Sequence, residues 1–122
     1  MKSVLMISHG SQSPLTKEEV IRLTEHLKQE SKLKIFEIAF LEINSPSIPE
    51  GIEHCVQKGA HEVVLLLNFL NSGNHVLEDI PAFVEDAVKK YPHVKFRMTP
   101  TIGQHPKISH LFLEMIRDAT AV

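Results

Sequence analysis

Four short hydrophobic segments recur along the chain, each followed by a polar loop. The third is the most apolar, with an unbroken aliphatic run over Val63–Leu67. Such runs are typical of strands buried on both faces of a sheet. Val94, Phe96 and Met98 instead alternate with polar residues, which indicates a half-exposed strand at an edge. The pattern predicts four strands, at Ser3–Ser8, at Lys34–Leu41, at Glu62–Phe69 and from Val94 onward.

Apolar residues at helical spacing follow each of these strands. Thr16 and Glu19 have capping-box spacing and predict the start of the first helix, which carries Val20, Leu23 and Leu27. A second helix is expected from Ser47 to Lys58, with Gly59 as its stop. The last two helices each gather their apolar residues on one face. These residues are Ile80, Phe83, Val84, Ala87, Val88 and Tyr91 in the third helix, and Ile108, Leu111, Phe112, Met115, Ile116 and Ala119 in the fourth.

Strands alternating with helices predict an α/β fold, with a four-stranded, mostly parallel sheet and helices on both of its faces. The 122 residues, 43% of them hydrophobic, are expected to form a single doubly wound domain spanning residues 1–122. A net charge of −2 provides no basic field for nucleic acid or an anionic membrane, and no apolar run approaches the ~20 residues of a membrane span. The single Cys55 cannot form an intramolecular disulfide, so a cytoplasmic protein is expected.

Candidate chemistry lies in the loops after the strands, because ligands bind at the carboxyl edge of such sheets. His9, Glu42, His75 and His105 each follow a different predicted strand. Two imidazoles and a carboxylate at one edge are a plausible site for a divalent metal. Simpler interpretations remain open at this point: Glu42 could cap the following helix, His9 could bond a backbone carbonyl, and His75 could lie in a plain connecting loop with Gly73 at a positive φ.

The loop after the first strand also holds Gly10, Ser11 and Ser13, small residues at a helix start. Backbone N–H groups there could bind an anion, or the residues could simply make a turn. No Gly-x-Gly-x-x-Gly or Walker motif is present, which argues against a nucleotide cofactor. The absence of Trp disfavours a flavin site, and Ser8 stands where a phosphohistidine phosphatase would have Arg. No organic cofactor is expected.

Four motifs, in order and at successive strand–helix junctions, resemble the short sirohydrochlorin chelatases, the CbiX group. They are Ile7-Ser8-His9-Gly10-Ser11, Phe40-Leu41-Glu42, the segment from Phe69 to Pro81 with Gly73, His75 and Asp79-Ile80-Pro81, and Ile102-Gly103-x-His105-Pro106. The resemblance implies a chelatase-like fold and a lyase that inserts cobalt or ferrous iron into sirohydrochlorin, in cobalamin or sirohaem biosynthesis. Nickel is a further candidate, and in each case the metal is a substrate.

The same resemblance implies roles for individual residues. His9 and His75 would bind the metal and Glu42 would be the accompanying acid, all three being catalytic, with His105 in second place. Local recognition of the acidic macrocycle is expected near Gly10, Ser11 and Ser13 and around Ser72, Gly73 and Asn74. Chains of this length look like half of the longer two-lobed chelatases, which implies a homodimer. Gln12 replaces an Arg that is common in the family, so a non-catalytic metal or tetrapyrrole carrier is the alternative.

Overall fold

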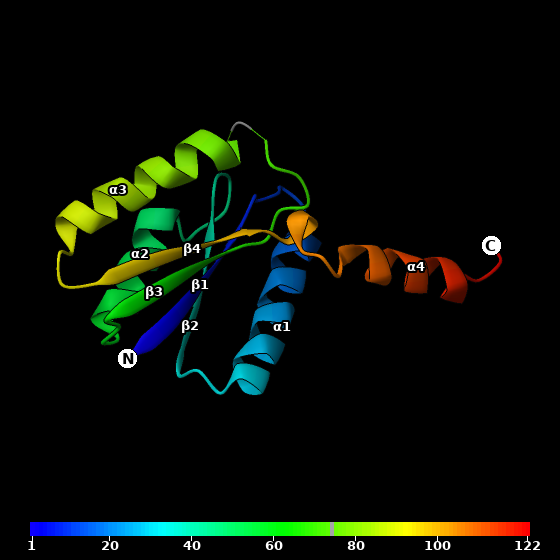
Figure 1. The fold of residues 1–122 in the computed structure, drawn as a ribbon, viewed down its shortest axis with the longest axis horizontal. Coiled ribbons are helices and arrows are strands. Elements are labelled where there is room, and N and C mark those ends of the chain that lie inside the picture. Colours follow the sequence, from blue (N-terminus) through cyan, green and yellow to red (C-terminus); the bar gives the residue numbers. More distant parts are fainter. Residues whose placement is uncertain (74) are drawn as a thin grey trace.

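The computed structural model describes residues 1–73 and 75–122, while Asn74 and the side chains of His75 and Leu77 lie outside the described part. Strands and helices alternate along the chain (Figure 1). The elements are β1 (Lys2–Ser8), α1 (Pro14–Ser31), β2 (Ile35–Phe40), α2 (Ile48–Gln57), β3 (Glu62–Leu67), the π-helix η1 (His75–Asp79), α3 (Ile80–Lys90), β4 (Lys95–Thr101), the 3-10 helix η2 (Ile102–Gln104) and α4 (Ile108–Asp118).

The four strands form one parallel sheet in the order β2-β1-β3-β4. Ser8 pairs with Phe40 and Ile7 with Leu67, so the carboxyl ends of β1, β2 and β3 lie level with one another. The predicted α/β class and parallel sheet are confirmed, and so is the position of β4 at an edge. The loop after β1 therefore lies beside the loops after both β2 and β3.

Each face of the sheet has its own hydrophobic core. Helices α2 and α3 cover one face, where Leu5, Val63 and Leu65 are fully buried. Helix α1 lies on the other face, where Val4 and Met6 of β1 pack against Val20 of the helix. Helices therefore lie on both faces, as predicted.

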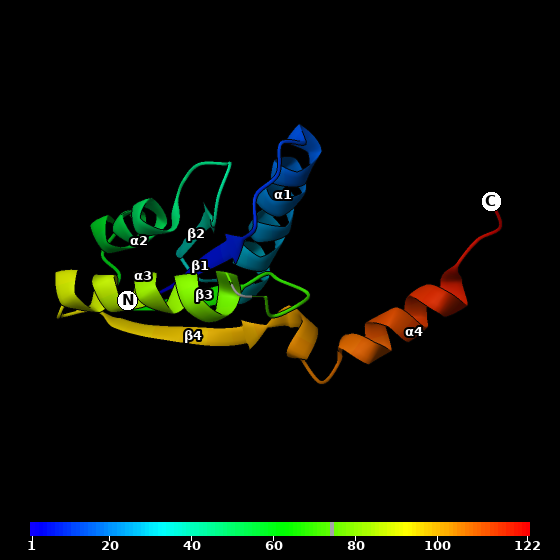
Figure 2. The same cartoon turned by 90° about the horizontal axis from the view of Figure 1, so that it is seen from above.

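The expectation that β3 is buried on both faces is wrong. Val63, Leu65 and Leu67 are at most 3% exposed, but Val64 and Leu66 on the opposite face are only half-buried. The reason is that α4 does not pack on that face. In two perpendicular views α4 projects away from the sheet beyond η2 (Figures 1 and 2).

Helix α1 begins at Pro14, before the predicted start, and Ser13 is its N-cap. Proline suits the first turn of a helix because its φ is already helical and its missing N–H would have no partner there. Thr16 consequently lies inside the first turn, where its N–H donates to the Ser13 carbonyl at 3.2 Å, and the predicted capping box with Glu19 is wrong.

Helix α2 does have a capping box. The Glu50 N–H donates to Ser47 Oγ at 3.3 Å, and the Ser47 N–H donates to Glu50 Oε1 at 2.9 Å. The backbone hydrogen bond from Ser47, followed by the one to its side chain, lowers the pKa of the Glu50 carboxyl below its ordinary value. Ser47 is thus the cap residue of α2, within one residue of the predicted start.

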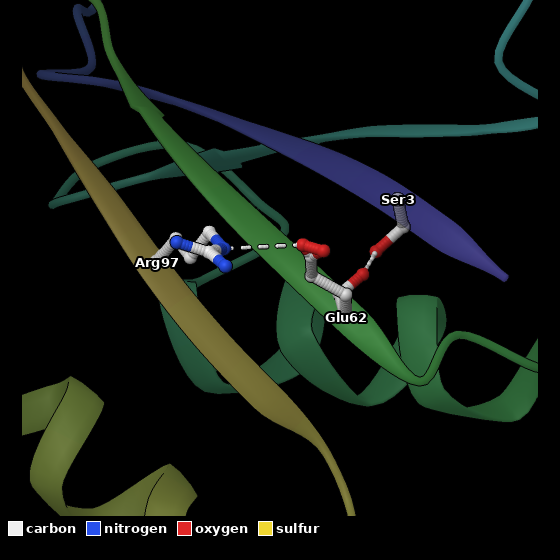
Figure 3. A network of polar contacts seen from close by, with 3 residues as sticks. All are labelled: Ser3, Glu62 and Arg97. Carbon is white, nitrogen blue, oxygen red and sulfur yellow. Dashed lines mark hydrogen bonds and ion pairs between the residues drawn. The ribbon is translucent and has the colours of Figure 1, made fainter.

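Polar contacts join β1, β3 and β4 at the amino-terminal end of the sheet, opposite the loops that carry the candidate residues (Figure 3). The buried Ser3 hydroxyl donates to the Glu62 carbonyl at 2.9 Å, and Arg97 Nε donates to Glu62 Oε2 at 3.2 Å. Nothing in the described part of the chain is a helix long and apolar enough to cross a membrane.

Candidate metal centre

His9 and Glu42 come together where neighbouring strands end. His9 follows β1 directly, and Glu42 stands two residues beyond β2, which pairs with β1. His9 Nε2 lies 2.9 Å from Glu42 Oε1, and the two side chains are 52% and 49% exposed. The pair is therefore held by the protein and accessible to a ligand at the same time.

Backbone hydrogen bonds fix the two loops against each other. The Leu41 N–H donates to the Ser8 carbonyl at 2.9 Å, and the Glu42 N–H donates to the His9 carbonyl at 3.1 Å. Gly10 has a φ of +105°, and a Cβ at this position would overlap the Glu42 carbonyl oxygen. Only glycine allows this close approach without strain. Gly73, which the sequence allowed to take a positive φ, does not have one.

Two asparagines that the sequence interpretation missed complete the junction. The Ser11 N–H donates to Asn44 Oδ1 at 2.7 Å, and Asn68 Nδ2 donates to Ser8 Oγ at 3.1 Å. The buried Phe69 ring meets the His9 imidazole edge to face, with ring centres 6.2 Å apart. Asn44 lies in the loop after β2, so the rule that selected Glu42 could also have selected it. Asn68 and Phe69 fall within the strand that the sequence predicted over Glu62–Phe69, although β3 ends at Leu67.

The simpler interpretation of Glu42 does not hold. Helix α2 is capped by Ser47 and Glu50, and Glu42 instead faces the imidazole of His9. Ile43, the next residue, has a φ of 70°, which is rare for a β-branched residue. The backbone thus turns sharply at the point where it presents Glu42 to His9.

The third predicted ligand, His75, is the first residue of η1, and its side chain lies outside the described part of the structure. Glu42 and Asp79, the last residue of η1, line the same cavity of about 260 Å³, so this helix lies next to the Glu42 loop. Among the described side chains, no three His, Cys, Asp or Glu residues gather closely enough to hold a metal ion.

The residues expected to bind substrate lie in two loops. The Ser11 N–H donates to Asn44, and the Ser13 N–H donates to Ser11 Oγ at 3.1 Å. These two amides are therefore already paired within the protein, which differs from the anion site that the sequence suggested. The exposed Ser72 has its Oγ 3.4 Å from Thr101 Oγ1. The Gly73 carbonyl accepts from the Val76 N–H at 3.1 Å, and Asn74 lies outside the described residues.

His105 is separated from the His9–Glu42 pair in the sheet order. It follows β4, and β3 lies between β4 and β1. Its Nδ1 accepts the Lys107 N–H at 3.0 Å, within the turn that leads into α4. The structure thus gives His105 a part in a turn.

The chain is thus a parallel α/β protein with a half-exposed imidazole–carboxylate pair at the carboxyl edge of its sheet, the edge where proteins of this class bind ligands. Comparison with known proteins gives the family. The CbiX family model matches residues 3–119. A sirohydrochlorin cobaltochelatase of Priestia megaterium is 36% identical over 120 residues, which are 98% of this chain and 39% of that protein. The chain belongs to the CbiX family.

Solved structures agree with this assignment. The sirohydrochlorin chelatase SirB from Bacillus subtilis subspecies spizizenii, in complex with cobalt, matches with a TM-score of 0.86 and 26% identity, over 96% of this chain and 50% of SirB. A putative CbiX protein from Marinobacter aquaeolei VT8 shares the fold at a TM-score of 0.82, with 97% of this chain and 93% of that chain aligned. The chain spans between 39% and 57% of the length of the curated relatives that it matches.

Proposed function

We propose that this chain is one chelatase-like lobe, formed by residues 1–122, of an enzyme that inserts cobalt or ferrous iron into sirohydrochlorin. The observation that supports it most directly is the half-exposed His9–Glu42 pair, with its 2.9 Å separation, at the carboxyl edge of the sheet. The names of the relatives, sirohydrochlorin cobaltochelatase and ferrochelatase, supply the substrate class. Nickel is compatible with the same ligands.

The separation between His9 Nε2 and Glu42 Oε1 suits two neighbouring ligands of one metal ion. Nitrogen and oxygen ligands lie about 2.1 Å from such ions, so adjacent ligands at a right angle are about 3 Å apart. A divalent ion could therefore replace the proton between the two side chains without moving either loop. His75 would supply a further ligand. An incomplete protein ligand set lets the metal leave for the four ring nitrogens.

The pair can also take up the protons that the reaction releases. Insertion breaks two N–H bonds of the macrocycle as the metal forms bonds to the ring nitrogens. A neutral His9 and an ionised Glu42 can each accept one proton once the metal has left. A divalent cation is thereby exchanged for two protons at the same two side chains, so the net charge of the site does not change.

The macrocycle would lie across the carboxyl edge, next to His9 and Phe69. Gly10, Ser11 and Ser13 on one side and Ser72, Gly73 and Asn74 on the other would contact its carboxylates. The Ser11 and Ser13 amides already have acceptors within the protein, so hydroxyl groups are the better donors in this loop. His105 would have only an accessory role.

One lobe offers a single edge to a broad, flat substrate, whereas binding sites usually cover most of a ligand's surface. We therefore also propose a homodimer with twofold symmetry, the commonest closed assembly, in which two such edges face a shared cavity. Metal insertion without hydrolysis or oxidation would make the enzyme a lyase, and a cytoplasmic location is proposed from the single buried Cys55.

The test is turnover by the purified protein. With sirohydrochlorin and Co²⁺ or Fe²⁺ under anaerobic conditions, the absorbance of the macrocycle should change faster than without protein, for several turnovers per site. His9→Ala, Glu42→Gln and His75→Ala should each reduce the rate at least tenfold. His26→Ala, at an exposed position on α1, is the matched control and should keep the full rate. Metal binding without repeated turnover would support the carrier alternative instead, and no acceleration with any divalent metal would refute the proposal.

A further inference from the structure

Helix α4 presents an apolar face that nothing in the described part of the chain covers. Every residue after Ile108 is exposed. Its apolar side chains recur at helical spacing, and its polar residues, among them His110 and Glu114, lie on the opposite side. An isolated helix of this length is marginal in water, so packing must stabilise it. The large exposed residues on the apolar face are Leu111 (51%), Phe112 (48%), Met115 (67%) and Ile116 (72%).

A groove of matching character lies along the sheet face that α1 covers only in part. Two cavities of about 550 and 370 Å³ share Leu27 and Leu66, so they form one continuous depression beside α1. We call it the α4 groove, and its apolar lining includes Val4, Met6, Leu23, Leu27, Val64 and Leu66. The groove holds the same half-buried β3 residues, Val64 and Leu66, that the sequence predicted to be covered.

The turn before α4 directs the helix away from the groove of its own chain. The His105 N–H donates to the Ile102 carbonyl at 3.1 Å, and the Ile108 N–H donates to the His105 carbonyl at 3.0 Å. A Cβ at Gly103 would overlap the Leu70 carbonyl oxygen, so η2 packs directly against the loop that follows β3. To cover its own groove, α4 would have to break this hydrogen-bonded turn. In its present direction (Figures 1 and 2) it can reach only another molecule.

We propose that α4 docks in the α4 groove of a second copy of this chain, so that two chains exchange their C-terminal helices about a twofold axis. Exchange of identical elements is a common route to dimers, and one contact made twice closes the assembly. The proposal specifies the contact surface of the homodimer proposed above, but it rests on the two uncovered apolar faces and on no step of metal insertion.

The area is sufficient for a stable dimer. Complete burial of a large apolar side chain removes about 60–120 Å² of surface, and α4 still has roughly half to two-thirds of that to lose at each position. Counting the groove that it covers, two symmetric exchanges would bury roughly 600–1,100 Å² of apolar surface. Specific, stable interfaces bury about 1,200–2,000 Å² in total. Homodimer interfaces are about 65% apolar, so roughly 600–1,100 Å² of apolar surface corresponds to roughly 900–1,700 Å² in total and overlaps this range. One helix on its own groove would bury half as much.

Cysteine cross-linking can test the exchange directly. The native Cys55 is buried and desolvation raises the pKa of its thiol to about 11, so it will not take part. Leu23→Cys and Met115→Cys chains with affinity tags of different length should be co-expressed and mildly oxidised. We expect a disulfide-linked heterodimer on a non-reducing gel. Glu114→Cys, on the polar face of α4, is the matched control and should cross-link to Leu23→Cys at least fivefold less.

A single chain that carries both Leu23→Cys and Met115→Cys distinguishes exchange of α4 between two chains from folding of α4 back onto its own groove. Exchange predicts covalent dimers, whereas a cross-linked monomer, or no cross-link at all, would overturn the proposal. Light scattering provides a second readout, because Phe112→Glu should convert the dimer to a monomer and Glu114→Lys should not. A fully active monomer would refute the exchange and leave the chelatase function intact. Cross-linked dimers that fail to insert metal would refute the function alone.

Discussion

The close approach of Gly10 to Glu42 allows a quantitative test of how the candidate site is held together. At a φ of +105°, an alanine would adopt a conformation that costs about 1–2 kcal/mol for an L-residue. Its Cβ would also overlap the Glu42 carbonyl oxygen. Relieving an overlap in a packed region typically costs about 1–3 kcal/mol more. Gly10→Ala should therefore lower the free energy of unfolding by about 2–5 kcal/mol.

Gly59 is a matched control for this substitution. It has a φ of +100°, but a Cβ there would meet nothing within 4 Å, so Gly59→Ala should cost only the conformational part. Gly73→Ala, with open space and no positive φ, should be nearly neutral. For a chain of this size 1 kcal/mol corresponds to about 3–5 °C in Tm, so Gly10→Ala should melt roughly 6–25 °C lower and Gly59→Ala roughly 3–10 °C lower.

Activity should separate these variants more sharply than stability. The overlap at Gly10 can be relieved only by moving the His9 loop away from the Glu42 loop, which would break the 2.9 Å contact between the two side chains. At a temperature where each variant is folded, Gly10→Ala should lose at least tenfold in metal insertion and Gly59→Ala should retain the full rate. Equal effects of Gly10→Ala and Gly59→Ala on both Tm and rate would refute the reasoning.

Three further substitutions test other parts of the fold. Ile43→Asn should raise the free energy of unfolding by about 1 kcal/mol, because Asn tolerates a φ of 70° better than a β-branched residue; a lower Tm in thermal unfolding would contradict this. Burial raises the pKa of Cys55 from an ordinary value of about 9 to about 11, so stability should be complete below pH 9 and fall by about 2–3 kcal/mol as pH rises through 11. Urea unfolding of Cys55→Ala should lack this part of the loss. Arg97→Ala, which breaks the partly exposed pair with Glu62, should cost less than about 1 kcal/mol by the same assay, and a larger cost would mean that the cross-strand contact is stronger than its exposure implies.

Local patterns in the sequence were sufficient to predict the strands and helices and the edge of the sheet that carries the candidate site. Unbroken aliphatic runs indicated the buried strands, and apolar residues at helical spacing indicated the helices. Both patterns arise because a strand or helix must bury the apolar side chains on the faces that pack against the core. The rule that ligands bind at the carboxyl edge of a parallel sheet then selected His9 and Glu42. The same rule selected His105 equally well, since each of these residues follows a strand.

The order of the strands, which only the tertiary structure provides, distinguishes these residues. Strand β1 pairs with β2, so His9 and Glu42 touch, whereas β3 stands between β1 and the strand that precedes His105. Pairing between strands distant in sequence depends on packing of the whole sheet, and no local pattern encodes it. The start of α1 is a different case, because Pro14 is a local signal in the sequence and determines the first turn in place of the Thr16–Glu19 spacing.

Helix α4 marks the limit of what periodicity can determine. The spacing of Leu111, Phe112, Met115 and Ile116 correctly predicted an amphipathic helix, because that pattern depends only on the 3.6-residue turn. A periodic pattern specifies that one face must be covered but not by what. The direction of α4 depends on the hydrogen-bonded turn from Ile102 to Ile108 and on the seat of Gly103 against Leu70, which are contacts between parts of the chain that meet only after folding.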